Sequence, residues 1–204
     1  MEISTKKTRP GLYLVLAGPD GSGKSTLAKL IIEGASGAFS EQLHLHWRPG
    51  VLPRLGSLFG RSEGDVAQPH SKPPHSPIVS TGMILYYWLD FLFGSWIRIK
   101  PARRRNGLVL MERGWWDFAI DPLRYRLAPF PSLVMLLGRV LPKPDVVLIL
   151  EARPETLLKR KQELPANELA RQLQGWRDIR FPSSVPSLYL DGSKEPEANV
   201  LAIK

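Results

Sequence analysis

Apolar and polar positions alternate along the chain in blocks that indicate strands separated by helices. Five short apolar runs have the length of buried strands, and the segments between them are long enough to cross over a sheet and begin the next parallel strand. This pattern predicts an α/β fold with a five-stranded parallel sheet flanked by helices. The runs are Leu12 to Ala17, Gln42 to Trp47, Gly107 to Met111, Asp145 to Leu150 and Ser187 to Leu190.

Five segments between these strands have the pattern of helices, and two of them, Leu157 to Glu163 and Ala166 to Arg180, lie on either side of Pro165. Residues Ser25 to Ser36 follow the first strand, and Ser132 to Leu141 form a short apolar helix. Met83 to Ile99 is rich in aromatic residues and contains Asp90, which makes it marginal as a membrane span and normal as a core helix. A second interpretation stays open, because several basic residues follow this run and the pair of features is typical of contact with an anionic lipid surface.

The stretch from residue 51 to residue 77 is predicted to be a mobile loop, since it is rich in Gly, Pro, Ser and His. One helical turn is expected within it, at Leu55 to Phe59.

Composition narrows the class of protein. The chain has 204 residues, 43% apolar and 23% charged, which is typical of one soluble domain spanning residues 1–204. The net charge of +9 implies anionic partners, which a nucleotide satisfies, and no nucleic-acid-binding module is recognisable. The absence of cysteine excludes disulfides and thiolate metal ligands. The polar N-terminus has no apolar leader, so we expect a cytoplasmic protein, with homodimerisation left open.

The segment from Gly18 to Thr26 carries the most specific chemistry. Its G-x-x-x-x-G-K-[ST] spacing, between a strand and a helix, is that of the phosphate-binding loop of a three-layer P-loop NTPase fold. Lys24 would meet the β- and γ-phosphates, and the Ser25 hydroxyl would reach their Mg²⁺. The sequence therefore predicts binding of Mg-ATP. The expected ATP-binding residues are Gly18, Asp20, Gly21, Ser22, Gly23, Lys24, Ser25 and Thr26.

A second group of candidates follows the third strand, where Glu112 and Arg113 emerge at its carboxyl end. Ligands bind at that end of an open parallel sheet. Glu112 could hold a water on Mg²⁺ or accept a proton, and Arg113 could clamp a phosphate. The alternative is a salt bridge that only closes the strand.

Together these motifs resemble the thymidylate kinase-like group of nucleoside monophosphate kinases. The resemblance implies transfer of the ATP γ-phosphoryl group to an acceptor bound beside the third strand, with Mg²⁺ as cofactor. The residues that carry it are Asp20 in the phosphate loop, Arg48-Pro49-Gly50, Tyr87 and Asp90 on the aromatic helix, Glu112-Arg113, and Arg153-Pro154-Glu155 leading to Arg160.

The resemblance also implies roles for single residues. Asp20 would face the acceptor, Arg48 and Arg113 would grip its charged part, and Tyr87 would stack against its ring. A lid over residues 153–180 would supply the cation that meets the transferred group. The candidates for that cation are Arg160, Lys161 and Arg171, and Gly192 is expected near the adenine.

The sequence departs from this family at the acceptor site. Phe91 stands where the family has an arginine, Trp115 and Trp116 follow Glu112-Arg113, and Arg124 lies in a basic segment with no counterpart. Arg124 could restore the lost positive charge. A nucleoside monophosphate is the acceptor that the family implies, with a sugar, sugar phosphate or lipid-linked saccharide as the alternative. A non-catalytic nucleotide-binding protein is the further alternative.

Overall fold

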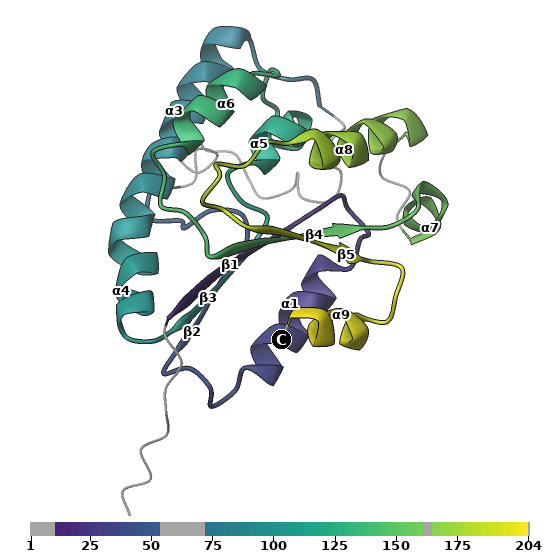
Figure 1. Cartoon of the computed structure of the whole chain (residues 1–204). Coiled ribbons are helices and arrows are strands. Elements are labelled where there is room, and N and C mark those ends of the chain that lie inside the picture. The colour runs from purple at the N-terminus through teal and green to yellow at the C-terminus, as the bar shows by residue number, and fades with distance from the viewer. Residues whose placement is uncertain (1–10, 54–71, 161–164, 204) are drawn as a thin grey trace, which may run out of the picture.

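A parallel sheet organises the part of the chain that the structure, a computed structural model, describes: residues 11–53, 72–160 and 165–203 (Figure 1). Its strands lie in the order β2-β3-β1-β4-β5, and every neighbouring pair runs parallel. The helical turn predicted at Leu55 to Phe59 falls outside the described residues. The strands are β1 (Leu12–Ala17), β2 (Gln42–Leu45), β3 (Leu108–Glu112), β4 (Val146–Glu151) and β5 (Ser187–Asp191).

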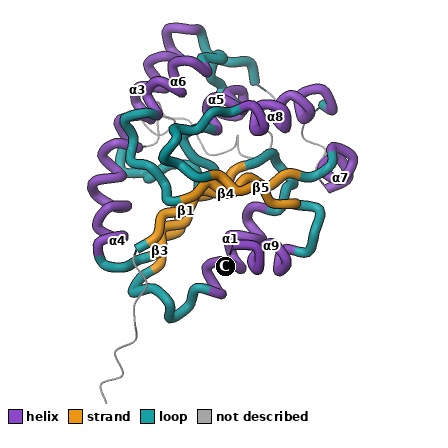
Figure 2. The backbone as a smooth tube through the Cα atoms, viewed as in Figure 1, coloured by secondary structure: helices purple, strands orange, loops and turns teal. Residues whose placement is uncertain are grey.

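Helices cover both faces of the sheet, which gives three layers (Figure 2). Side chains alternate along each strand, so Leu14 and Leu16 of β1 join one apolar core, whereas Tyr13 and Val15 join the other. The three-layer α/β architecture predicted from the sequence is confirmed. Helices α1 (Lys24–Gly34) and α9 (Pro196–Ile203) cover the first face, and the second carries α3 (Pro77–Gly94), α5 (Asp117–Ile120), α6 (Pro131–Gly138) and α8 (Ala166–Asp178).

The aromatic helix is longer than the sequence predicts. It begins at Pro77, where the Ser76 hydroxyl caps it by accepting from Val79 N at 3.5 Å. It then runs through a π-helical turn, η1 (Ser95–Ile99), into α4 (Lys100–Arg104). By length and composition alone, Pro77–Arg104 could cross a membrane, but one side of it is buried in the second core.

Element ends differ from the predicted ones where packing overrides the local pattern. Strand β2 stops at Leu45 because Trp47 leaves the sheet and packs edge-on against Tyr87, with ring centroids 5.3 Å apart. No helix is predicted from the sequence after β5, but the segment there forms α9, and Asn199 Nδ2 of α9 donates to Asp191 O at 2.9 Å. The expected lid region contains α7 (Pro154–Arg160) and α8, and residues 161–164 between them lie outside the description.

The carboxyl ends of the strands all open at one edge of the sheet. Strand β1 leads into the glycine-rich loop, β3 into Arg113, and β5 into Gly192. A short 3-10 helix, η2 (Pro122–Tyr125), brings Arg124 to the same region, because its guanidinium reaches Asp20 of the glycine-rich loop. Parallel topology therefore gathers segments that are far apart in sequence at one edge.

Candidate active site

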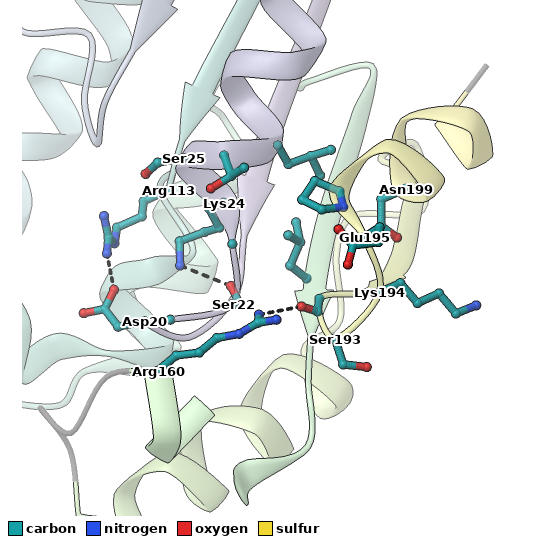
Figure 3. Close-up of a pocket in the computed structure, with 17 residues that line it drawn as sticks. Asp20, Ser22, Lys24, Ser25, Arg113, Arg160, Ser193, Lys194, Glu195 and Asn199 are labelled. Atoms are coloured by element: carbon teal, nitrogen blue, oxygen red, sulfur yellow. Dashed lines mark hydrogen bonds and ion pairs between the residues drawn. The ribbon is translucent and has the colours of Figure 1, made fainter. Parts of the chain in front are cut away.

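The loop from Gly18 to Gly23 forms one wall of a cavity of about 430 Å³ (Figure 3). Gly18 has φ +130°, and a Cβ there would lie 2.4 Å from the main-chain oxygen of Leu150. Gly23 has φ +95° and precedes α1, which begins without a side-chain cap. An uncapped helix start leaves amide groups and the positive end of the helix dipole available to an anion. The wall of this cavity is therefore suited to phosphate.

Lys24 is folded over this loop. Its Nζ donates to Gly18 O at 2.9 Å and to Pro19 O at 2.7 Å, and its side chain is buried. Burial, and then the nearby Arg113 guanidinium, lower the pKa of Lys24 from its ordinary 10.5 to about 8. The negative charges of Asp20 and Asp117 compensate the Lys24 cation only in part, and a bound phosphate would provide the rest.

Ser25, Glu112 and His44 form a chain of polar contacts beside the loop. Ser25 Oγ donates to Glu112 Oε2 at 2.6 Å, and His44 Nε2 lies 2.9 Å from Glu112 Oε1. A hydroxyl and a carboxylate are hard oxygen donors of the kind that Mg²⁺ prefers, so this pair fits the ion when phosphate and water complete its shell. Across the described ranges no group of three or more His, Asp or Glu could hold a metal by itself.

His44 was missed by the sequence analysis. The signal available was the alternation of His44 and His46 with Leu43 and Leu45 in the predicted strand Gln42 to Trp47, which places both histidines on one face of it. Because β2 pairs with β3, this face adjoins the strand that ends in Glu112.

Asp20 is gripped by two arginines. One carboxylate oxygen accepts from Arg113 Nη2 and the other from Arg124 Nη1 (Figure 3 labels the Asp20–Arg113 pair). Burial opposes ionisation of Asp20, but the charges of Arg113, Lys24 and Arg124 outweigh it and hold the pKa of this carboxyl well below its usual range. Arg113 has φ +60°, an uncommon conformation for a residue with a side chain, which the turn after β3 imposes.

The far wall of the cavity comes from α7 and from the segment after β5. Arg160 Nη1 donates to Gly192 O at 2.7 Å, so these two predicted site residues meet at the cavity. Arg171 is turned elsewhere, because its guanidinium donates to Ile120 O and Glu168. Lys161, the third predicted lid cation, lies outside the described residues. The lining includes Asp20 to Leu27, Arg113, Leu150, Arg160, Gly192 to Pro196 and Asn199.

Arg48 and Asp90 form a buried pair apart from this cavity. Arg48 Nη1 lies 3.2 Å from Asp90 Oδ2, and both side chains are buried. Asp90 also accepts from the backbone N–H groups of Gly50, Val51 and Leu52 at 2.6 to 2.9 Å. Its position therefore gives Asp90 the role of an anchor for the Arg48-Pro49-Gly50 loop.

Tyr87 and Trp115 lie within the aromatic core. The Tyr87 ring stacks on Phe118, with centroids 5.3 Å apart and planes 3° from parallel. The Trp115 indole N–H donates to Val134 O at 2.7 Å, and its side chain is 3% exposed. Neither residue lines the cavity described above, in contrast to Asp20 and Arg113.

Asp117 is a buried carboxyl that the sequence analysis did not single out. It accepts from Gly114 N at 2.8 Å, which fixes the turn that follows Arg113. Burial raises the pKa of Asp117 to about 6, although the charges of Arg113 and Lys24 oppose the rise.

Comparison with known proteins bears on the fold. No protein-family model matches the sequence, and no curated protein is similar to it. Among solved structures, the thymidylate kinase from Ehrlichia chaffeensis superposes with a TM-score of 0.63 at 16% sequence identity, covering 96% of this chain and 99% of that one. The chain thus has a thymidylate kinase-like fold over nearly its whole length, as the motif resemblance implied.

Proposed function

We propose that this chain is a phosphotransferase that moves the γ-phosphoryl group of Mg-ATP to a small acceptor carrying its own phosphate group. A nucleoside monophosphate is the first candidate, in keeping with the structural neighbour, a thymidylate kinase. The observation that carries the proposal is the meeting of Lys24, Asp20 and Arg113 at one cavity wall. This arrangement combines a binding site for a triphosphate with positively charged side chains that can bind a second anion, the phosphate of the acceptor.

The glycine-rich loop, with Lys24, would hold the β- and γ-phosphates. Ser25 and Glu112 would hold Mg²⁺, which neutralises charge on the phosphate oxygens when bound. The segment around Gly192, on the far wall, would contact the nucleoside. Arg160 lies close enough to this segment to donate to Gly192 O, and it can turn toward the transferred group.

The acceptor would bind on the side of Arg113 and Arg124. Both guanidiniums share the single carboxylate of Asp20, so this cluster has a net positive charge and can accommodate a phosphate. Asp20 stays ionised at neutral pH because its pKa is lowered, and it can therefore accept a hydrogen bond from an acceptor hydroxyl. In the transfer, the bond between the γ-phosphorus and its bridging oxygen breaks, a bond to an acceptor phosphate oxygen forms, and ADP leaves.

A carbohydrate acceptor has less support. It was suggested by Trp115, Trp116 and the long loop at residues 51–77. Both tryptophan side chains are buried, and most of the loop lies outside the described residues. No observation on the described residues favours a sugar over a phosphorylated acceptor.

The proposal is tested by incubating the protein with γ-labelled ATP, Mg²⁺ and a panel of nucleoside monophosphates, sugars and sugar phosphates. We expect label transfer to at least one phosphorylated acceptor, a severe loss of transfer in Arg113→Gln, and none of that loss in Lys29→Gln, an exposed residue of α1. Nucleotide binding without transfer to any member of the panel would contradict the proposal in favour of a non-catalytic role. Transfer to unphosphorylated sugars alone would contradict the choice of acceptor.

A further inference from the structure

The long helix from Pro77 to Arg104 presents an apolar stripe to solvent. From Ile78 to Trp96 the stripe residues follow one another at intervals of seven, four, four and three positions, so they line one face of the helix, while Ile84 and Phe91 on the other face are buried. Trp96 is 57% exposed and Ile97 60% exposed, which is unusual for such large apolar side chains. The stripe residues are Ile78, Leu85, Leu89, Phe93, Trp96 and Ile97.

Helix α6 widens this stripe. It lies beside α3 (Figure 1), and the Trp88 indole N–H of α3 donates to Leu137 O at the end of α6, at 3.1 Å. Leu136 and Val140 are 58% and 63% exposed there. We call the stripe together with these two residues the apolar face.

No exposed acidic side chain accompanies the apolar face. Between residues 72 and 144 the only acidic residues are Asp90, Glu112, Asp117 and Asp121, and all four are buried. Basic residues are numerous in the same stretch and include Arg98, Lys100, Arg104 and Arg139. The electrostatic character of this side of the molecule is therefore predominantly positive, with two half-exposed acids at the end of the helix, Asp145 paired with Arg103 and Glu41 paired with Arg105.

A basic hollow lies at the C-terminal end of the stripe. It has a volume of about 250 Å³ and is lined by Gly11, Lys100, Arg103 and Arg104. Lys100 Nζ sits 3.2 Å from the centroid of the Trp96 ring, which joins the hollow to the stripe. Arg103 donates to Asp145 through Nη2, but its buried Nε has no hydrogen-bond partner among the described residues. The hollow thus has the size and charge for a phosphate group.

We propose that this side of the protein docks on the surface of an anionic phospholipid bilayer. The apolar face enters the boundary between headgroups and acyl chains, and a lipid phosphate occupies the basic hollow. An amphipathic helix with aromatic and basic residues at one end is the arrangement that binds such an interface. The proposal is independent of the phosphotransferase assignment.

Two alternatives fit the described residues less well. The helix does not span a bilayer, because its inner side packs into the core and carries Asp90 with its backbone partners. A second copy of the chain, paired face to face, would place basic ends together, or place each basic end opposite the residues that precede α3, of which the described ones, 72–76, carry no carboxylate. An anionic membrane supplies the negative charge that the described residues of neither copy would offer to the basic residues in such a dimer.

The test is cosedimentation of the full chain with vesicles of equal parts phosphatidylglycerol and phosphatidylcholine, and with vesicles of phosphatidylcholine alone. We expect binding that requires the anionic lipid. Trp96→Ser with Ile97→Ser should lower the partition by at least about 10-fold. Lys100→Gln with Arg104→Gln should lower it by about 30-fold. Matched controls are Leu201→Ser, exposed on α9, and Lys29→Gln on α1, and neither should change the partition.

A second measurement uses the absence of cysteine. Ile97→Cys gives a single site for an environment-sensitive fluorophore, and its emission should shift to the blue with the anionic vesicles, whereas a label at Leu201→Cys should not respond. The proposal is overturned if the chain does not bind these vesicles, or if the stripe variants bind them as well as the unmodified chain does. It is also overturned if sedimentation without lipid shows a dimer that the stripe variants abolish.

Discussion

Asp90 allows a quantitative test of how the long helix holds the Arg48-Pro49-Gly50 loop. Its two carboxylate oxygens accept hydrogen bonds from three backbone N–H groups, and Oδ2 also pairs with the Arg48 guanidinium. Asp90 itself is 0% exposed. Asp90→Asn keeps one oxygen but turns the other into an NH₂ donor, which would then face the Gly50 N–H and the Arg48 guanidinium.

The expected cost follows from these contacts. Removing one partner of a buried ion pair costs about 3–5 kcal/mol, because the remaining charge stays buried. We therefore expect Asp90→Asn to lower the free energy of unfolding by about 3 kcal/mol or more. In a chain of this length, that loss corresponds to a decrease in melting temperature of roughly 6–12 °C.

Urea unfolding followed by circular dichroism and tryptophan fluorescence measures this loss. Asp178→Asn is the matched control, because Asp178 is exposed on α8 and, among the described residues, accepts from the exposed side chain of Gln174, so its cost should stay within about 0.5 kcal/mol. The double variant with Arg48→Gln should cost less than the sum of the two single variants, since both remove the same pair. A loss below about 1 kcal/mol for Asp90→Asn would refute the anchoring role.

Four further predictions concern the glycine-rich loop and the charged residues around it. Gly18→Ala should unfold the loop or abolish nucleotide binding, because its Cβ would collide with the Leu150 main chain; near-normal binding would contradict the observed backbone. Since the pKa of Lys24 is lowered to about 8, phosphate binding should raise it, so nucleotide binding slightly above that pH should take up a proton. Calorimetry in buffers of different ionisation enthalpy measures this uptake, and a buffer-independent heat would argue against it. Arg124→Gln should raise KM for the acceptor by about 10-fold or more while leaving KM for ATP nearly unchanged, and an equal rise in both would place Arg124 elsewhere. The pKa of Asp117 is raised to about 6, so the folded state binds the carboxyl proton more tightly than the unfolded state does. The stability that the bound proton contributes is therefore lost as the pH rises from about 4 to about 7. Asp117→Asn should lack that loss, which is on the order of 3 kcal/mol, and parallel pH profiles of unfolding would refute the assignment.

The glycine-rich loop and the strands were predictable because their signals are local. Gly18 and Gly23 have positive φ that their spacing anticipates, and the apolar runs that form β1, β3 and β4 are buried on both faces, as central parallel strands are. The position of Glu112 beside Ser25 followed from the rule that strand ends gather at one edge of a sheet.

Other features depended on contacts that no local pattern carries. A tryptophan such as Trp115 looks the same in the sequence whether it lines a pocket or fills a core. Its indole N–H donates to Val134 O, and this contact depends on how α6 packs. Arg124 and Asp20 are 104 positions apart, so the sequence shows that Arg124 is charged but not that it pairs with Asp20. The π-helical turn at Ser95–Ile99, where the Ser95 hydroxyl donates to Phe91 O, had no periodic signal.

The most direct test of the central claim is a calorimetric titration of the folded protein with ATP in the presence of Mg²⁺, run in parallel on Lys24→Ala. We predict saturable binding at one site and a loss of affinity of about 10- to 100-fold in the variant, because a charge-assisted bond to phosphate is removed. Absence of binding to the unmodified protein, or equal affinity in Lys24→Ala, would contradict the claim that the loop after β1 holds a nucleoside triphosphate.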